Sequence, residues 1–282
     1  MECRRLELAV VGHVEWVQFA RVDHVPLAGE VVHAVEPFEE PAGGGAVAAV
    51  QLARLAGRAR LFTALGQDGL GERSAARLGE LGVVVHAARV SEPTRRAITL
   101  VDDAGERTIT TLGPRVEPCG DDGAVGWGEL AALDGAYFTA GDLSALRAAR
   151  AAARVLVASP RARAALGHGV PLDALVLSGE DAIERAAAAP AEREAELLVL
   201  TEGARGGSYR TRTGLAGRWE AAPLPGARVD AYGCGDSFAA GLTYGLAAGL
   251  EIPAALALAA RCGAMCITGR GPYERQLADP AP

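Results

Sequence analysis

The 282-residue sequence contains no lysine and no asparagine, so arginine carries all of its positive side-chain charge apart from histidine. Any cationic side chain that contacts an oxyanion must therefore be a guanidinium, whose planar donors suit two-point contacts to oxygen. Because both residue types are missing while alanine, arginine and glycine are abundant, the composition indicates drift across the whole chain. A missing asparagine at one motif position therefore carries little weight.

Cysteine is also scarce. The sequence has five cysteines, which is an odd number, and it contains no C-x-x-C pair. This argues against a disulfide framework or a structural zinc site and fits a reducing cytoplasm. Cys262 and Cys266 share a face of an expected helix, where small core residues are favoured over metal ligands. No apolar run reaches the roughly 20 residues of a membrane-spanning helix. The net charge of −7 argues against nucleic-acid or anionic-membrane partners.

Apolar runs typical of buried strands alternate with helical patterns along most of the chain. This alternation predicts an α/β protein with a largely parallel sheet. Expected strands occupy residues 6–11, 60–64, 136–139, 155–158, 174–177 and 197–201, and expected helices occupy residues 46–55, 71–81, 143–153, 181–189, 235–250 and 253–267.

Two regions break this rhythm, because residues 14–35 and 97–111 show β patterns without an intervening helix. They are expected to pair as a small second sheet that covers a site, although two ordinary surface hairpins fit the pattern equally well. The acidic residues Glu36, Glu39 and Glu40 that follow the first region are interpreted as a solvated loop.

The most informative segment runs from Asp230 to Gly241. Gly233 and Gly235 permit backbone conformations that direct successive N–H groups into one anion-binding concavity. A helical pattern starts at once, so this nest of amides lies at a helix N-terminus, where the helix dipole also attracts anions. The segment therefore predicts a phosphate site, although one such motif is a weak signal by itself.

Asp236 lies in the first turn of that helix. The dipole is expected to keep its carboxylate ionised at neutral pH, which makes it a weak base. Phosphoryl transfer tolerates a weak base, because positioning and charge stabilisation lower most of the barrier. A simple helix-capping carboxylate is an equally good interpretation of the local sequence.

Residues 230–241 resemble the D-T-x-G-A-G-D-x-F-x-x-G motif of the ribokinase-like, or PfkB, carbohydrate kinases, with Ala231 and Cys234 as small departures. Four further segments resemble family motifs in the same order along nearly the whole chain. They are the turn 26–30, the glycines 43–45 with their helix, the segment 66–71 and the strand-turn 201–207.

The resemblance implies a single domain over residues 1–282, with a Rossmann-like three-layer core and a β-sheet lid at about 14–35 and 97–111. It places Asp236 as the base that takes the acceptor hydroxyl's proton, and Gly233, Cys234 and Gly235 as the nest around the transferred phosphoryl group. Ser178, Thr201, Gly203 and Gly206 would line the ATP, although a plain hairpin turn also explains Gly206.

The resemblance is weaker at the acceptor. The family's asparagine and aspartate positions after the first strand are Glu15 and Val17, and the asparagine after the glycine pair is Val47. The implied acceptor-binding residues are His13, Glu15, Gly43, Gly44 and Arg95. A lid arginine could hold an acidic acceptor, although a solvated edge is the preferred interpretation of Arg95, Arg96 and Arg107. Arg161 and Arg163, after an expected strand, face either the site or water.

The resemblance also implies metal ions. Glu180 and Asp181 fall where the family has its N-x-x-E motif and would help to place Mg²⁺ through phosphate or water. A monovalent cation, for which K⁺ is the candidate, would lie near Asp230, Tyr232, Cys266, Gly269 and Gly271. A homodimer through the lid strands is a further expectation.

The favoured hypothesis is a cytoplasmic, ATP-dependent kinase that phosphorylates a hydroxyl of a sugar or a sugar-derived small molecule. A nucleoside kinase of the same family and a non-catalytic ligand-sensing relative are the alternatives. A nicotinamide oxidoreductase is disfavoured, because no G-x-G-x-x-G follows the first strand.

Overall fold

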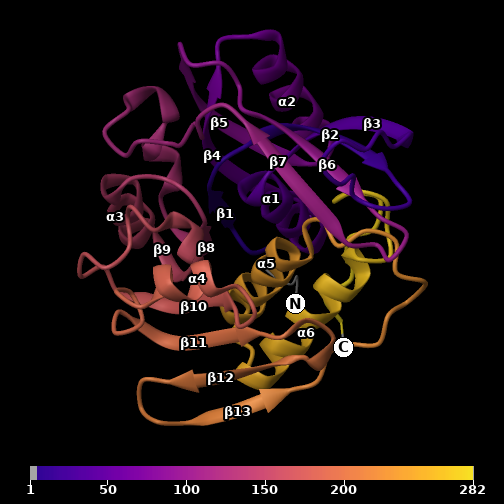
Figure 1. Cartoon of the computed structure of the whole chain (residues 1–282). Coiled ribbons are helices and arrows are strands. Elements are labelled where there is room, and N and C mark those ends of the chain that lie inside the picture. The colour runs from indigo at the N-terminus through magenta and orange to yellow at the C-terminus, as the bar shows by residue number, and fades with distance from the viewer. Residues whose placement is uncertain (1–4, 282) are drawn as a thin grey trace.

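The computed structural model describes residues 5–281, which form a large sheet, a small sheet and six α-helices (Figure 1). The large sheet has nine strands in the order β13-β12-β11-β10-β9-β8-β1-β4-β5. Neighbours from β11 to β5 run parallel, whereas β12 and β13 run antiparallel at one edge. The strands are β1 (Leu8–Val11), β4 (Ala59–Gly66), β5 (Val83–Val90), β8 (Leu133–Phe138), β9 (Ala153–Ala158), β10 (Leu172–Ser178), β11 (Ala195–Thr201), β12 (Gly207–Thr211) and β13 (Ala216–Trp219).

Helices cover both faces of this sheet. Alternate residues of a strand point to opposite faces and pack in two separate hydrophobic clusters. Leu8 and Val10 of β1 pack in one cluster, whereas Ala9 and Val11 pack in the other. The first cluster lies under α1 (Gly44–Ala56), α2 (Gly69–Glu80), α5 (Cys234–Ala247) and α6 (Ile252–Cys266), and the second lies under α3 (Leu143–Ala152) and α4 (Ala182–Ala188). The predicted three-layer α/β core is confirmed.

The expected strands and helices are all present, with ends displaced by a few residues. The pattern did not reveal β5 or the hairpin of β12 and β13. The hairpin strands at the sheet edge contain glycine, serine and arginine in place of an apolar run. A continuous hydrophobic run is expected only where both faces of a strand are covered.

Close packing of α5 on α6 fixes the position of α5 against the sheet. A β-carbon at Gly241 would lie 2.7 Å from Cys262 Sγ, and one at Gly245 would lie 2.9 Å from Ala255 Cα. Cys262 and Cys266 are fully buried in α6, as expected for core residues. Cys119 and Cys234 are also free, and Cys3 lies outside the described residues.

The two β regions pair as a second sheet of order β3-β2-β6-β7, in which β2 (Glu15–Arg21) runs parallel to β6 (Arg96–Val101). The outer strands are β3 (Val35–Ala42) and β7 (Arg107–Leu112). The second strand of the first region thus lies beyond the expected residues 14–35. The interpretation of Glu36, Glu39 and Glu40 as a solvated loop is wrong, because these residues belong to β3. Trp16 Nε1 donates to Glu39 Oε2 at 3.0 Å, and Arg77 Nη2 donates to Glu40 Oε1 at 3.0 Å.

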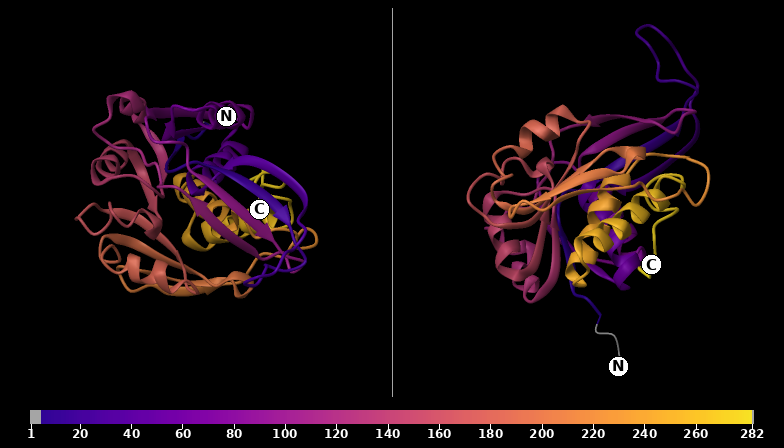
Figure 2. Two further views of the ribbon diagram at one scale, coloured as in Figure 1. Left: turned by 45° about the horizontal axis from the view of Figure 1, so that its top comes forward. Right: turned by 90° about the horizontal axis from the view of Figure 1, so that it is seen from below.

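The connection between β2 and β3 projects away from the body of the molecule (Figure 2, right). It carries Leu27 and Val31, which are 75% and 82% exposed. The turn at residues 26–30 forms as expected, because the backbone N–H of Leu27 donates to Glu30 Oε2 at 2.9 Å. Within residues 5–281, no helix has both the length and the apolar character needed to cross a membrane.

Candidate active site

The candidate site lies where β1, β8 and β9 end. Val11, Phe138 and Ala158 are neighbours in register across these parallel strands, so the residues that follow them meet at one edge of the sheet. The N-termini of α1 and α5 approach this edge as well. A β-carbon at Gly44 would lie 2.9 Å from Asp236 Oδ1 and 3.1 Å from Thr139 Oγ1.

The amide nest is set by the conformation of Gly233. This residue is the N-cap of α5 with φ 81° and ψ −1°, a left-handed conformation that glycine adopts without strain, and it makes no side-chain capping hydrogen bond. The backbone N–H of Ser237 donates to Gly233 O at 2.8 Å. The N–H groups of residues 234–236 precede this bond and are the groups that a helix N-terminus leaves for an anion.

Asp236 stands in the first turn of α5 and is partly exposed, whereas Ser237 and Phe238 beyond it are buried. Partial burial raises the pKa of the Asp236 carboxyl, and the carboxylate of Glu184 adds to this effect. The positive charges of Arg161 and Arg107 act in the opposite direction. Desolvation thus opposes the effect of the helix dipole and makes this carboxylate a better proton acceptor than an exposed one.

The glycines before α1 connect the nest to the acceptor residues. Gly43 has φ 89°, and its N–H donates to the hydroxyl of Tyr232 at 3.1 Å. A β-carbon at Gly43 would lie 3.0 Å from the His13 ring and 3.3 Å from Glu15 Cγ. A side chain at Gly43 would therefore be in tight contact with both predicted acceptor residues and would adopt a backbone conformation that favours glycine.

His13, Glu15 and Arg95 form a buried polar group at the base of the lid. Arg95 Nε lies 3.6 Å from Glu15 Oε2, an ion pair too long to be a hydrogen bond. Burial lowers the pKa of His13, and the charges of Arg115, Arg161 and Arg95 lower it further. Burial raises the pKa of Glu15 despite Arg95. The sequence argument preferred a solvated edge for Arg95, but the side chain is only 15% exposed.

The predicted nucleotide residues lie at the ends of β10 and β11. Ser178 and Thr201 are paired in register there, and residues 203–206 turn the chain into β12. A β-carbon at Gly206 would lie 2.1 Å from Trp219 O, and Gly206 has φ 77°. The hairpin alone therefore requires glycine at this position.

Asp181 and Glu180, the predicted Mg²⁺ residues, make local contacts. Asp181 Oδ1 accepts from the N–H of Ile183 at 2.8 Å and so caps α4. Glu180 pairs at 2.7 Å with exposed Arg205. Glu184 is the carboxylate that faces Asp236: it accepts from Arg161 Nε at 2.8 Å and from Ser178 N at 2.9 Å.

Four of the predicted monovalent-cation positions lie together beside the nest. The buried Asp230 carboxylate accepts from the N–H groups of Tyr232 and Gly271 at 2.8 and 3.0 Å. The Cys266 thiol donates to the carbonyls of Tyr232 and Pro272 at 3.4 and 4.0 Å. The fifth, Gly269, donates its N–H to Cys266 O.

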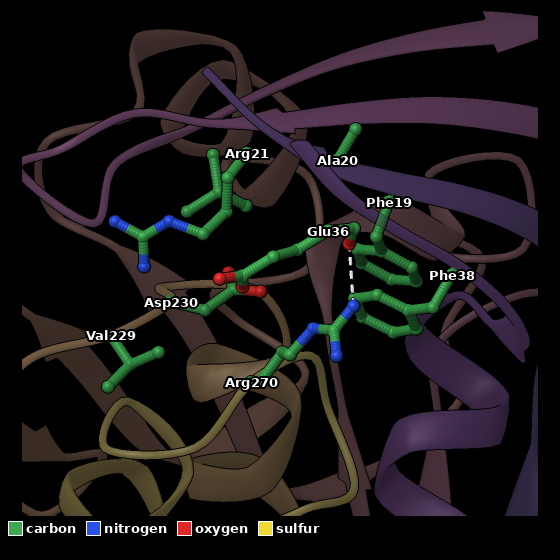
Figure 3. Close-up of a pocket in the computed structure, with 9 residues that line it drawn as sticks. Phe19, Ala20, Arg21, Glu36, Phe38, Val229, Asp230 and Arg270 are labelled. Carbon is green, nitrogen blue, oxygen red and sulfur yellow. Dashed lines mark hydrogen bonds between the residues drawn. The ribbon is translucent and has the colours of Figure 1, made fainter. Parts of the chain in front are cut away.

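A small cavity of about 30 Å³ lies on the lid side of Asp230 (Figure 3). In the figure, the carboxylates of Asp230 and Glu36 lie between Arg21 and Arg270. Its volume is that of a single water molecule, so it cannot hold a sugar or a nucleotide. The cavity lies between the small sheet and the core, because strands β2, β3 and β6 and the segments around Asp230 and Arg270 line it.

Val17 and Val47, the residues that replace polar family positions, are fully buried. Val17 packs in the core under the lid. A β-carbon at Gly233 would lie 2.9 Å from Val47 Cγ1, so Val47 supports the nest. Valine at these two positions therefore removes polar groups that could contact an acceptor and places apolar side chains in the core.

Sequence reasoning missed Thr139, Glu184 and Arg115 as site residues. Thr139 is the first residue after β8, and Arg115 follows a Gly-Pro pair after β7. Arg115 Nη1 donates to Arg161 O at 3.2 Å. The rule that ligands bind at the carboxyl ends of parallel strands would have pointed to Thr139.

The fold and the position of the site define a phosphotransferase of the α/β class. The pfkB family carbohydrate kinase model matches residues 5–168 and 171–278. The chain therefore belongs to the PfkB family, and it is a sugar or nucleoside kinase of that family.

Known proteins agree with this assignment. A fructokinase of Klebsiella pneumoniae is 28% identical over 84% of this chain and 90% of that protein. The structure of Arabidopsis thaliana ribokinase complexed with ribose and ATP is similar at a TM-score of 0.73 and 19% identity, over 98% of this chain and 97% of that one. The nucleoside kinase of Methanocaldococcus jannaschii has a TM-score of 0.73 and 15% identity, with the same coverage of each chain.

Proposed function

We propose that this protein transfers the terminal phosphoryl group of ATP to a hydroxyl of a sugar or sugar-derived acceptor, with Asp236 as the base. The observation that carries the proposal is the pairing of an uncapped α5 N-terminus with a partly exposed carboxylate in its first turn. A carboxylate that only capped the helix would have its pKa lowered by hydrogen bonds from first-turn amides, whereas burial and nearby charges set the pKa of Asp236 and raise it.

The chain's own groups suit each requirement of the reaction. Asp236 accepts the proton of the acceptor hydroxyl, and its raised pKa improves that acceptance at neutral pH. The free amides of residues 234–236 at the start of α5 and the dipole of that helix stabilise the charge on the migrating phosphoryl group. Gly44 lets the acceptor side of the site approach the carboxylate closely.

The acidic residues fit a magnesium ion that is held mainly by the nucleotide. Within residues 5–281, no group of three or more His, Cys, Asp or Glu side chains forms a metal cage. Mg²⁺ at phosphate sites usually takes one or two carboxylates, phosphate oxygens and waters. Glu184 would hold it, with Asp181 and Glu180 further out, and the ion would neutralise charge on the bridging phosphate oxygens.

The predicted potassium site fits less well. Each Asp230 oxygen accepts from one amide and the Tyr232 carbonyl accepts from the Cys266 thiol, so one lone pair of each oxygen is engaged within the protein. We assign no step to such an ion.

A sugar-like acceptor is preferred to a nucleoside. A curated relative is a fructokinase, whereas the similar structures include both a ribokinase complexed with ribose and ATP and a nucleoside kinase. A nucleoside base would need an aromatic platform from the lid, but Arg73 covers the Trp16 ring at 4.2 Å and Phe19 stacks on Phe38 at 4.7 Å. The lid aromatics are therefore already in contact with other side chains.

ATP consumption with a panel of sugars, sugar acids, sugar phosphates, polyols and nucleosides tests the proposal. We expect ADP release with at least one acceptor and a fall of about 10²- to 10⁴-fold in Asp236→Asn. Glu129→Gln removes an exposed carboxylate outside the site and should retain activity within a few-fold. Equal turnover by Asp236→Asn would remove Asp236 from its role, and ligand binding without any turnover would favour the sensing protein.

A homodimer through the lid is a further part of the proposal. The lid exposes Ile98, Ile109 and Leu112, each between 37% and 40%. Light scattering would give twice the monomer mass, and Ile109→Glu would reduce it. A monomer at all concentrations would contradict this expectation.

A further inference from the structure

Three arginines from separate segments converge on the acceptor end of the site. Arg95 precedes β6, Arg115 follows β7, and Arg161 follows β9. Arg95 forms the ion pair with Glu15, and Arg115 donates to the backbone of Arg161. The three charges act together on buried His13.

Three buried polar atoms at this place make no hydrogen bond within residues 5–281, although two of them face each other in the ion pair. They are His13 Nδ1, Glu15 Oε2 and Arg95 Nε. His13 and Glu15 are each only 5% exposed. Most buried polar atoms in folded proteins have a hydrogen-bond partner, so a group of orphaned donors and acceptors indicates a polar ligand.

The arginines keep donors free for such a ligand. Arg161 contacts Glu184 through Nε, and Arg115 contacts Glu117 through Nη1. The guanidinium of Arg95 makes no hydrogen bond in the described chain. Each arginine has one carboxylate partner, which is Glu15 for Arg95, Glu117 for Arg115 and Glu184 for Arg161, so this end is marked by unengaged guanidinium N–H groups and by no excess of positive charge. Guanidinium groups match the oxygens of carboxylates and phosphates, whereas a neutral hydroxyl makes no use of their charge.

We propose that the acceptor carries an anionic group, a carboxylate or a phosphate, which Arg95, Arg115 and Arg161 bind while the reacting hydroxyl lies at Asp236. The acceptor is then a sugar acid or a sugar phosphate, and a neutral sugar is a poor substrate. This inference rests on the proposed kinase function and specifies its acceptor.

Matched acceptors test the charge directly. The probes are ribose, ribonate and ribose phosphate, and glucose, gluconate and glucose phosphate. Binding is measured by calorimetry with Asp236→Asn, and turnover is measured with the unmodified enzyme. We expect at least one anionic probe to bind roughly tenfold or more tightly than its neutral counterpart. Comparison of the sugar acids with the sugar phosphates shows whether the bound group is a carboxylate or a phosphate.

Arginine variants then locate the contact. Arg95→Gln should raise the KM of the preferred anionic acceptor by roughly ten- to a hundredfold, with a smaller change in kcat. Arg161→Gln, at a half-exposed position, gives the same test if Arg95→Gln fails to fold. Arg96→Gln, at the exposed neighbouring residue, should change nothing.

The outcomes separate the inference from the function on which it rests. If no anionic probe binds more tightly than its neutral counterpart, or if Arg95→Gln and Arg161→Gln leave the preference unchanged, the inference is wrong. Asp236-dependent turnover of neutral sugars alone would also overturn it while retaining the kinase. Anionic binding without turnover would support the inference and contradict the proposed reaction.

Discussion

The proposed site has a phosphate half made of backbone groups and an acceptor half made of side chains. The phosphate half consists of backbone amides at the start of α5, shaped by Gly233 and supported by Val47. The acceptor half consists of side chains, His13, Glu15 and Arg95, under the lid. The family motif is nearly intact in the first half and largely replaced in the second.

This difference shows which part of the site withstands drift in composition. A nest of amides needs only a backbone conformation, so the loss of lysine and asparagine leaves it unchanged. A side-chain pocket changes its chemistry with every replacement. We therefore expect the proposed acceptor half to determine specificity and the proposed phosphate half to support the transfer.

The largest expected effect tests whether conformation matters more than side-chain chemistry in the phosphate half. Gly233→Ala places a β-carbon at φ 81°, 2.9 Å from Val47 Cγ1. A left-handed non-glycine residue costs about 1–2 kcal/mol, and a shift of the nest by 1 Å lowers kcat by roughly a hundredfold. Cys234→Ala changes a neighbouring side chain only and should keep kcat within a few-fold. Denaturant unfolding and steady-state kinetics measure both, and a large loss in Cys234→Ala alone would reverse the comparison.

The next effect is a pH dependence that links the two halves. Asp236 must be ionised to accept a proton, so kcat/KM should fall about tenfold per pH unit below its pKa. Because that pKa is raised, the fall begins at a higher pH than an exposed aspartate would give. Arg161→Gln removes a charge that lowers the pKa and should move the fall to still higher pH, and Arg107→Gln in the lid should do so by less. If the pH profiles of kcat/KM for both variants coincide with that of the unmodified enzyme, the charges of Arg161 and Arg107 do not affect the ionisation of Asp236.

A smaller effect tests why Val47 replaces asparagine. Val47→Asn puts an amide where the side chain is fully buried against Gly233, and an unsatisfied buried amide costs about 1–3 kcal/mol. We expect lower stability in denaturant and no gain of turnover with neutral sugars. Val47→Ala, which removes volume without adding polarity, separates the two causes. Gain of a neutral-sugar activity by Val47→Asn would show that position 47 faces the acceptor.

The sequence predicted the elements that bury apolar surface on both faces and the segments whose backbone forms a motif. The three-layer core and the pairing of the two β regions followed from hydrophobic patterns and the family resemblance. The sequence did not predict β3, because the charged residues Glu39 and Glu40 are typical of a loop. In the fold, Trp16 and Arg77 donate hydrogen bonds to these two carboxylates. Arg115 and Glu184 reach the site only through tertiary contacts, which leave no local pattern.

The smallest effect concerns stability and has opposite signs at two aspartates. The native pKa of Asp236 is raised, so the folded state binds its proton more tightly than the unfolded state does. That contribution is present below the unfolded pKa and is lost as the pH rises through the native pKa. Asp236→Asn should therefore be at least as stable as the unmodified protein at neutral pH.

Asp68 gives the matched contrast. Partial burial raises its pKa, but hydrogen bonds from Gly71 and Thr94 outweigh this and lower it overall. Its contribution is present above the unfolded pKa and is lost as the pH falls through the native pKa. Asp68→Asn keeps one oxygen for the helix cap but loses the second oxygen, which accepts from Thr94 N, so it should lose about 1 kcal/mol, the usual value of one hydrogen bond. Urea unfolding at neutral pH compares the two variants, and a stability loss in Asp236→Asn as large as that in Asp68→Asn would mean that Asp236 is a structural cap. A carboxylate that destabilises its own fold is retained for chemistry, and this sign separates the base from the cap without an acceptor in hand.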